Sequence, residues 1–105
     1  MKMEMKAYCS EGNLVIKLDG EIDHHSAADI RVEMDRMIAE TKPKILILEL
    51  SDIDFMDSSG LGLVLGRYRR LNELGSKMYI KNPAKRTEKI LSMAGVDKLI
   101  TIIKS

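Results

Sequence analysis

The sequence predicts an α/β protein whose mixed β-sheet has a parallel centre and an antiparallel edge and is packed with three to four helices. Residues 45–50 form a nearly continuous apolar run rich in β-branched side chains, which is typical of a buried central strand. Residues 61–74 then repeat apolar side chains at helical spacing. Two strand-like segments precede a first helix, and strands and helices alternate afterwards. The predicted order is therefore β-β-α-β-α-β-α-β.

The N-terminal residues predict a hairpin at the edge of the sheet. Apolar and polar side chains alternate between residues 3 and 8, which indicates an edge strand with one wet face. The Glu11-Gly12-Asn13 run supplies turn chemistry, and residues 14–18 form a second apolar strand. Gly20 then turns the chain, and residues 21–23 continue either as an extended segment or as a loop.

A first helix is predicted to begin near Ser26, because Asp29 three residues later completes an acidic version of a capping box. Its apolar residues share one face: Ile30, Met34, Met37 and Ile38. Pro43 follows the helix and cannot continue it.

The central strand is predicted to end in a loop at residues 51–60, and the second helix then runs to Gly75. Phe55 is predicted to plug this polar loop into the core, whereas Met56 fits either a core plug or a contact for a partner. Arg67 and the neighbouring arginines of the second helix are interpreted as an ordinary solvated face.

The C-terminal third predicts one more strand-helix-strand unit. Residues 76–81 form a strand, and Asn82-Pro83 fits an N-cap followed by proline at the first position of a third helix. That helix stops at Gly95, residues 96–99 add a helical turn, and residues 100–103 form a last short strand.

Length and composition restrict the classes of protein. With 105 residues, one domain spanning residues 1–105 is expected. The net charge of +1, from 17 basic and 16 acidic residues, argues against a nucleic-acid partner. A lone Cys9 allows no internal disulfide and fits a reducing compartment. No apolar run approaches the length of a membrane span, so a cytoplasmic protein without a membrane partner is expected.

The Asp57-Ser58-Ser59-Gly60 run lies where a strand is predicted to meet a helix N-terminus, and ligands of α/β folds tend to bind at that edge. Capping by Asp57 or Ser58 explains one such residue but not three in a row. Gly60, Gly62 and Gly66 each cost a helix about 1 kcal/mol relative to alanine. Such a cost indicates close backbone approach, either to the sheet itself or to a partner.

Two sequence blocks resemble those of a known family. The first resembles the phosphorylation-site motif of bacterial anti-sigma factor antagonists, the single-domain members of the STAS family, and reads Phe55-Met56-Asp57-Ser58-Ser59-Gly60-Leu61-Gly62. The second resembles the other characteristic segment of that family and reads Gly20-Glu21-Ile22-Asp23-His24-His25. The order and spacing of elements between residues 3 and 103 fit as well. Together they resemble the sporulation stage II antagonists.

The resemblance implies a binding protein switched by phosphorylation, with no catalytic activity, metal or cofactor. It implies that Ser58 accepts the phosphate and that Ser59 is the helix cap or supports the motif. The unphosphorylated form would bind an anti-sigma factor that is also an ATP-dependent serine kinase, freeing a sigma factor, and a serine phosphatase would reverse the modification. The implied partner-binding residues are Glu21, Asp23, Asp57, Ser58, Ser59, Gly60, Leu61 and Gly62.

Several alternatives remain open at this stage. A small nucleotide-binding or catalytic domain could use the Gly60-Gly62-Gly66 loop, although the glycine spacing is one residue longer than the common dinucleotide fingerprint. A STAS-like scaffold subunit of a stress-signalling complex would keep the serine chemistry and change the partner. Asp23-His24-His25 invites a metal hypothesis, but a catalytic zinc normally takes three protein ligands. A serine hydrolase would require a Gly-x-Ser-x-Gly elbow, which the sequence lacks.

Overall fold

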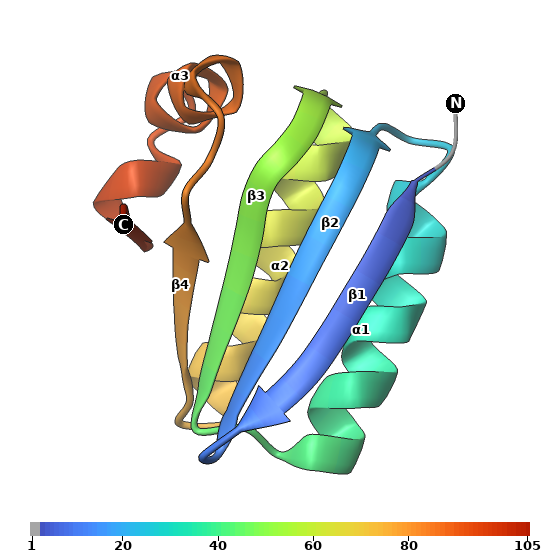
Figure 1. Ribbon diagram of the computed structural model, residues 1–105, viewed down its shortest axis with the longest axis vertical. Helices are drawn as coiled ribbons and strands as arrows, with labels where there is room; N and C mark the ends of the chain where they lie inside the picture. Colours follow the sequence, from blue (N-terminus) through green and yellow to red (C-terminus); the bar gives the residue numbers. More distant parts are fainter. Residues whose placement is uncertain (1–2) are drawn as a thin grey trace.

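Five strands form one mixed sheet in the computed structural model, which describes residues 3–105 (Figure 1). The edge strand β1 (Glu4–Ser10) pairs antiparallel with β2 (Asn13–Ile22). Strands β3 (Ile45–Met56), β4 (Lys77–Lys81) and β5 (Thr101–Ile103) continue the sheet in parallel. The predicted parallel centre and antiparallel edge are confirmed.

The helices connect the parallel strands in the predicted order. They are α1 (Ala27–Thr41), α2 (Ser58–Glu73) and α3 (Lys85–Met93), followed by the short 3₁₀ helix η1 (Val96–Lys98). The strand order β1-β2-β3-β4-β5 follows the chain, and right-handed crossovers that always step in one direction leave their helices on one face. Figure 1 accordingly shows α1 and α2 together behind the sheet. Within residues 3–105, no helix combines the length and apolar character needed to cross a bilayer.

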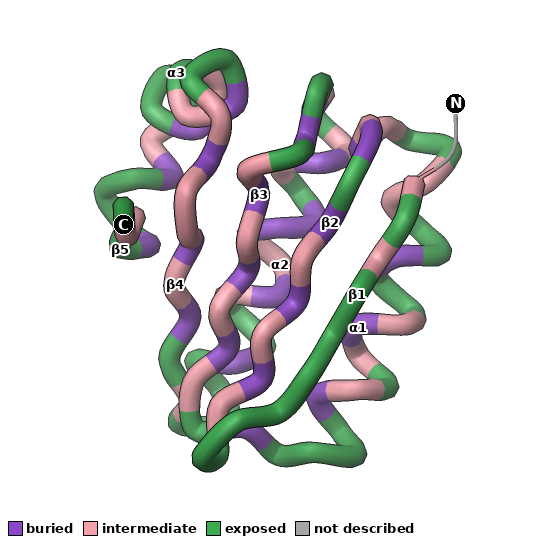
Figure 2. The backbone as a smooth tube through the Cα atoms, viewed as in Figure 1, coloured by how far each residue is buried: buried purple, intermediate pink, exposed green. Residues whose placement is uncertain are grey.

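The core lies between this face of the sheet and the helices. Burial alternates along β2, where every second residue from Leu14 to Ile22 is inaccessible and the residues between are half-buried or exposed (Figure 2). The same alternation begins β3, and α1 contributes Ile30, Met34 and Ile38. The buried side chains, which recur every second residue in the strands and about every 3.6 residues in the helix, thus pack against each other in one apolar layer.

The predicted loop at residues 51–60 is wrong. Strand β3 continues to Met56, and α2 begins at Ser58, so Asp57 alone separates the two elements. The polar residues at the end of β3 stay extended because they pair with β2 residues 19–22. Two register shifts interrupt this pairing, which explains why the alternation of apolar side chains breaks down there.

Two predicted helix starts also differ in detail. Ser26 occupies the N-cap position of α1, but its side chain makes no capping bond. Helix α3 begins at Lys85 rather than at Asn82-Pro83. The backbone of Asn82 has a positive φ of 49° and donates to the carbonyl of Ile103 at 2.8 Å, so this residue anchors the C-terminal strand instead of capping a helix.

The interpretation of Arg67 as a solvated residue is also wrong. Its side chain is only 11% exposed and lies between α1 and α2, where its Nε is 3.0 Å from Oδ1 of Asp35. Burial lowers the pKa of Arg67 from its ordinary value, and the Asp35 carboxylate opposes that effect. Within residues 3–105, Nε and one terminal nitrogen of Arg67 have no aligned hydrogen-bond acceptor, so the contact is an ion pair across the helix interface.

Candidate functional site

The two sequence blocks lie side by side at the carboxyl ends of β2 and β3. Glu21 pairs with Phe55, and Ile22 pairs with Met56. The ladder extends one step further, because the backbone N–H of Asp57 donates to the carbonyl of Ile22 at 3.2 Å. Sheet hydrogen bonds therefore fix the acidic end of β2 against the residues that lead into α2.

Asp57 caps the second helix. Its Oδ1 accepts hydrogen bonds from the backbone N–H groups of Ser59 at 2.8 Å and Gly60 at 3.1 Å. Of the two capping candidates in the sequence, Asp57 and Ser58, the structure selects Asp57, and a capping role for Ser59 is wrong. Ser58 is the first residue of α2 and is exposed, and no hydrogen bond within residues 3–105 engages its hydroxyl group.

Gly60 is buried and packs against the sheet. A Cβ atom at this position would lie 2.5 Å from Cγ of Met56, 2.9 Å from the carbonyl oxygen of Ile22 and 3.1 Å from Cγ2 of Ile22. The glycine therefore permits α2 to begin directly against β2 and β3. Gly62 is exposed, and a Cβ there would meet no atom within 4 Å. Of the two explanations for the glycines, close approach to the sheet accounts for Gly60, and Gly62 leaves the surface beside it open.

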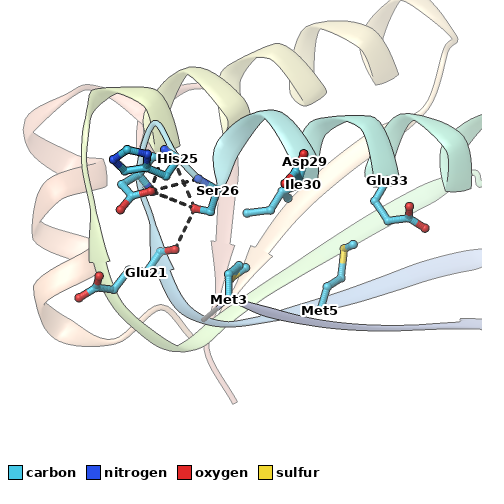
Figure 3. Close-up of a pocket in the computed structure, with 9 residues that line it drawn as sticks. Met3, Met5, Glu21, His25, Ser26, Asp29, Ile30 and Glu33 are labelled. Atoms are coloured by element: carbon cyan, nitrogen blue, oxygen red, sulfur yellow. Dashed lines mark hydrogen bonds between the residues drawn. The ribbon is translucent and has the colours of Figure 1, made fainter. Parts of the chain in front are cut away.

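The turn after β2 holds Asp23 in place. Its Oδ1 accepts hydrogen bonds from the N–H groups of His25 at 2.9 Å and Ser26 at 3.1 Å (Figure 3). The Ser26 hydroxyl donates to the carbonyl of Glu21 at 3.0 Å and accepts from the N–H of Asp23 at 3.1 Å. The Ser26 backbone bond is the largest cause that lowers the pKa of Asp23 from its ordinary value. Ser26, predicted from its position to begin the first helix, thus uses its side chain to close the turn before that helix.

The predicted core position of Phe55 is wrong, and Met56, for which a core plug and a partner contact were both open, is the core residue. Met56 is 2% exposed and belongs to the core, whereas Phe55 is 43% exposed beside the start of α2. The bulge in the β2–β3 register decides between them, because one residue of shift moves a side chain to the other face of a sheet. An exposed aromatic ring on the residue that pairs with Glu21 is suited to bind another protein. Leu61 is half-buried and packs against the core.

The structure gives the metal and nucleotide alternatives little support. The rings of His24 and His25 lie on the surface with their centroids 3.9 Å apart and their planes tilted by 39°, and no group of three possible metal ligands occurs within residues 3–105. A nucleotide phosphate at the start of α2 would need free backbone N–H groups. Those of Ser59 and Gly60 already donate to the Asp57 carboxylate, whose negative charge would also repel a phosphate.

Comparisons with known proteins identify relatives along nearly the whole chain. The family profile described as STAS domain matches residues 4–105. An anti-sigma F factor antagonist of Paenibacillus polymyxa is 34% identical over 102 residues, which cover 97% of this chain and 87% of that relative. An anti-sigma F factor antagonist of Lysinibacillus sphaericus is 37% identical over 83 residues, which cover 79% of this chain and 71% of that relative.

Solved structures give the same result. The anti-sigma factor antagonist SpoIIAA in its unphosphorylated form matches with a TM-score of 0.84 and 29% identity, covering 97% of this chain and 88% of that one. The Bacillus cell-fate determinant SpoIIAA in its phosphorylated form matches with a TM-score of 0.77 and 29% identity, covering 97% and 91%. The chain therefore belongs to the STAS domain family. Within that family it is a SpoIIAA-like anti-sigma factor antagonist, which is a non-catalytic regulatory protein.

Proposed function

We propose that this chain binds an anti-sigma factor while Ser58 is unphosphorylated and releases it once Ser58 carries a phosphate. The anti-sigma factor is also the ATP-dependent serine kinase that modifies Ser58, its capture frees a sigma factor for transcription, and a serine phosphatase restores the binding form. The observation that supports this proposal most directly is the position of Ser58, an exposed hydroxyl without a hydrogen bond in residues 3–105, at the start of α2 and two residues after the end of the β2–β3 pairing.

The partner-binding surface would consist of residues from the two adjoining strand ends and the first turn of α2. Gly60 contributes only indirectly, because it is buried and sets the position of the helix start. Gly62 contributes directly by leaving the outer face of α2 open. The proposed members are Glu21, Asp23, Asp57, Ser58, Ser59, Gly60, Leu61 and Gly62, and we add Phe55 because of its exposed ring.

Phosphorylation would act through charge and leave the fold unchanged. A phosphoserine adds a charge of about −1.5 to −2 at neutral pH. The nearest helix N–H groups already donate to Asp57, so the phosphate gains no capping bonds that could pull the loop into a new shape. The helix dipole favours the added charge by only about 0.3–1 kcal/mol.

The same charge is large enough to break an interface. A docked kinase must hold its own nucleotide phosphates near Ser58. Two charges facing one at roughly 6 Å repel by about 1.4 kcal/mol in water and about 5.5 kcal/mol at an effective dielectric constant of 20. That range corresponds to a loss of roughly tenfold to ten-thousandfold in affinity.

The test is to incubate the purified chain with ATP and extract of its native host and to measure its intact mass. A single added phosphate that maps to Ser58 supports the proposal, and Ser59→Ala serves as the matched control because it leaves Ser58 in place. Ser58→Asp is expected to abolish binding to the anti-sigma factor without unfolding the protein, and Ser58→Ala is expected to bind constitutively. Normal phosphorylation of Ser58→Ala would move the site elsewhere and overturn the proposal.

A further inference from the structure

A groove runs between β1 and the N-terminal half of α1, and its lining reaches Glu21 near the end of β2 (Figure 3). Its volume is about 640 Å³. Met5 from the edge strand, Met3 directly before it and Ile30 from α1 provide apolar surface, and both methionines are half-buried against the core. Methionine side chains are flexible and polarisable, and they adapt to apolar groups of different shapes.

The rim of this groove is acidic. Glu21 and Asp23 lie at one end, Asp29 and Glu33 continue along α1, and among residues 3–105 no lysine or arginine lines the groove. The hydrogen bonds described above lower the pKa of Asp23, and the hydrogen bond from Arg36 lowers the pKa of Glu33. Both groups therefore stay ionised at neutral pH, and the rim concentrates negative charge on a chain whose net charge is only +1.

Apolar surface and acidic rim together define the chemistry of an occupant. It must bring lysine or arginine side chains to the rim and an aliphatic side chain to Met3 and Met5, as one face of a short basic amphipathic segment does. The ion pair with Arg36 does not neutralise the negative charge of the rim. It is exposed, and it involves only Glu33 among the four carboxylates that line the groove.

We propose that this β1–α1 groove is a second docking subsite for the anti-sigma factor and binds a basic amphipathic segment of it. The inference rests on the proposed function and deepens it. Glu21 and Asp23 belong both to the groove and to the proposed switch surface, so the two subsites form one continuous interface. The groove extends that interface along α1 to a region that the two sequence motifs do not reach.

The groove, together with the switch surface, should contribute to the affinity of the unphosphorylated form for the anti-sigma factor. Glu33 lies six residues into α1, about 9 Å along the helix axis from its start. The outer part of the groove therefore adds contacts beyond the two strand ends and the first turn of α2.

The test compares two double variants that change the net charge equally. Asp29→Lys/Glu33→Lys reverses the groove rim, and Glu11→Lys/Glu73→Lys reverses two exposed carboxylates at the opposite end of the sheet (Figure 1). The probe is the anti-sigma F factor of Paenibacillus polymyxa, the organism whose antagonist is 34% identical. With Ser58 intact, the groove variant should raise the Kd for the anti-sigma factor by roughly tenfold, whereas the control should change this Kd by less than about twofold.

A second measurement tests peptide binding to the groove in the absence of the anti-sigma factor. A 16-residue peptide of leucine and lysine is titrated into the ¹⁵N-labelled chain, and the shifts of Met5, Ile30 and Glu33 are expected to move in the wild type and not in Asp29→Asn/Glu33→Gln. Equal losses of affinity in the groove variant and the control, or peptide shifts confined to other surfaces, would overturn the inference. A wild-type dimer that dissociates on rim reversal would also overturn it, because the occupant would then be a second copy.

The two proposals fail in different ways. If Ser58→Asp binds the anti-sigma factor as tightly as the wild type, the proposed switch is wrong, whatever the groove variants do. If the anti-sigma factor does not bind the wild type at all, the proposed partner is wrong, and the peptide titration still decides whether the groove takes a basic amphipathic segment.

Discussion

Replacing Gly60 by alanine should destabilise the protein, although alanine is the better helix former. The added Cβ would lie 2.5 Å from Cγ of Met56 and 2.9 Å from the Ile22 carbonyl oxygen, well inside the ordinary contact distance of about 3.5 Å. Neither neighbour can move away easily. Met56 is 2% exposed within the core, and the Ile22 carbonyl accepts the Asp57 N–H bond that joins the two strand ends.

The magnitude follows from two opposing effects. Overpacking a well-filled site costs about 1–3 kcal/mol, and the helix propensity of alanine returns up to about 1 kcal/mol. The net loss of unfolding free energy should be about 1–2 kcal/mol, which lowers Tm by about 4–8 °C for each kcal/mol in a domain of this size. Urea denaturation followed by circular dichroism measures the loss.

Gly62→Ala is the matched control, since the same substitution two residues later meets no atom within 4 Å. It should stabilise the protein by about 0.5–1 kcal/mol, because only the propensity effect remains. If Gly60→Ala proves as stable as Gly62→Ala, the close contact between α2 and the sheet does not exist as described. The explanation of Gly60 as a packing residue would then be wrong.

Three further outcomes are expected from the same structure. Asp35→Ala should lower the unfolding free energy by about 1–3 kcal/mol, since it leaves the Arg67 charge buried and unpaired, and adding Arg67→Met should restore most of that loss in urea denaturation. Asp23, with its lowered pKa, should stabilise its turn fully above about pH 3.8 and lose that contribution as pH falls through the lower folded-state pKa. The amide shifts of His25 should report that titration, and a midpoint at or above pH 3.8 would contradict the turn geometry. Phe55→Ser should weaken anti-sigma factor binding at least tenfold while changing stability by under about 1 kcal/mol, and a loss of stability without a loss of binding would return Phe55 to the core.

The sheet and its strand order could be predicted because apolar periodicity reports burial directly. The continuous run at the start of β3 and the helical spacing in α2 both follow from side chains that face a core. The end of β3 could not be predicted, because residues 51–56 are mostly polar and are held extended by backbone pairing with β2. Backbone hydrogen bonds leave no trace in side-chain composition.

The candidate site, too, could be predicted from the sequence only in part. The two motifs locate Glu21 and Ser58, and the structure adds that their strands are neighbours. Which of Phe55 and Met56 is buried depends on a register shift that no local pattern encodes. Arg67 is buried against Asp35, which lies in another helix. The residues around Arg67 in the sequence therefore give no indication that its side chain is buried.

The sequential strand order has a consequence for synthesis of the chain. Each strand pairs with the one made before it, and every residue proposed for the switch surface lies at or before Gly62. All residues proposed for that surface are therefore synthesised before β4, although the end of β3 gains its hydrogen bond from the Thr87 hydroxyl to the Ile53 carbonyl, at 3.2 Å, only once α3 has been made. The C-terminal third, from β4 onward, closes the core and contains none of the residues proposed for the switch surface.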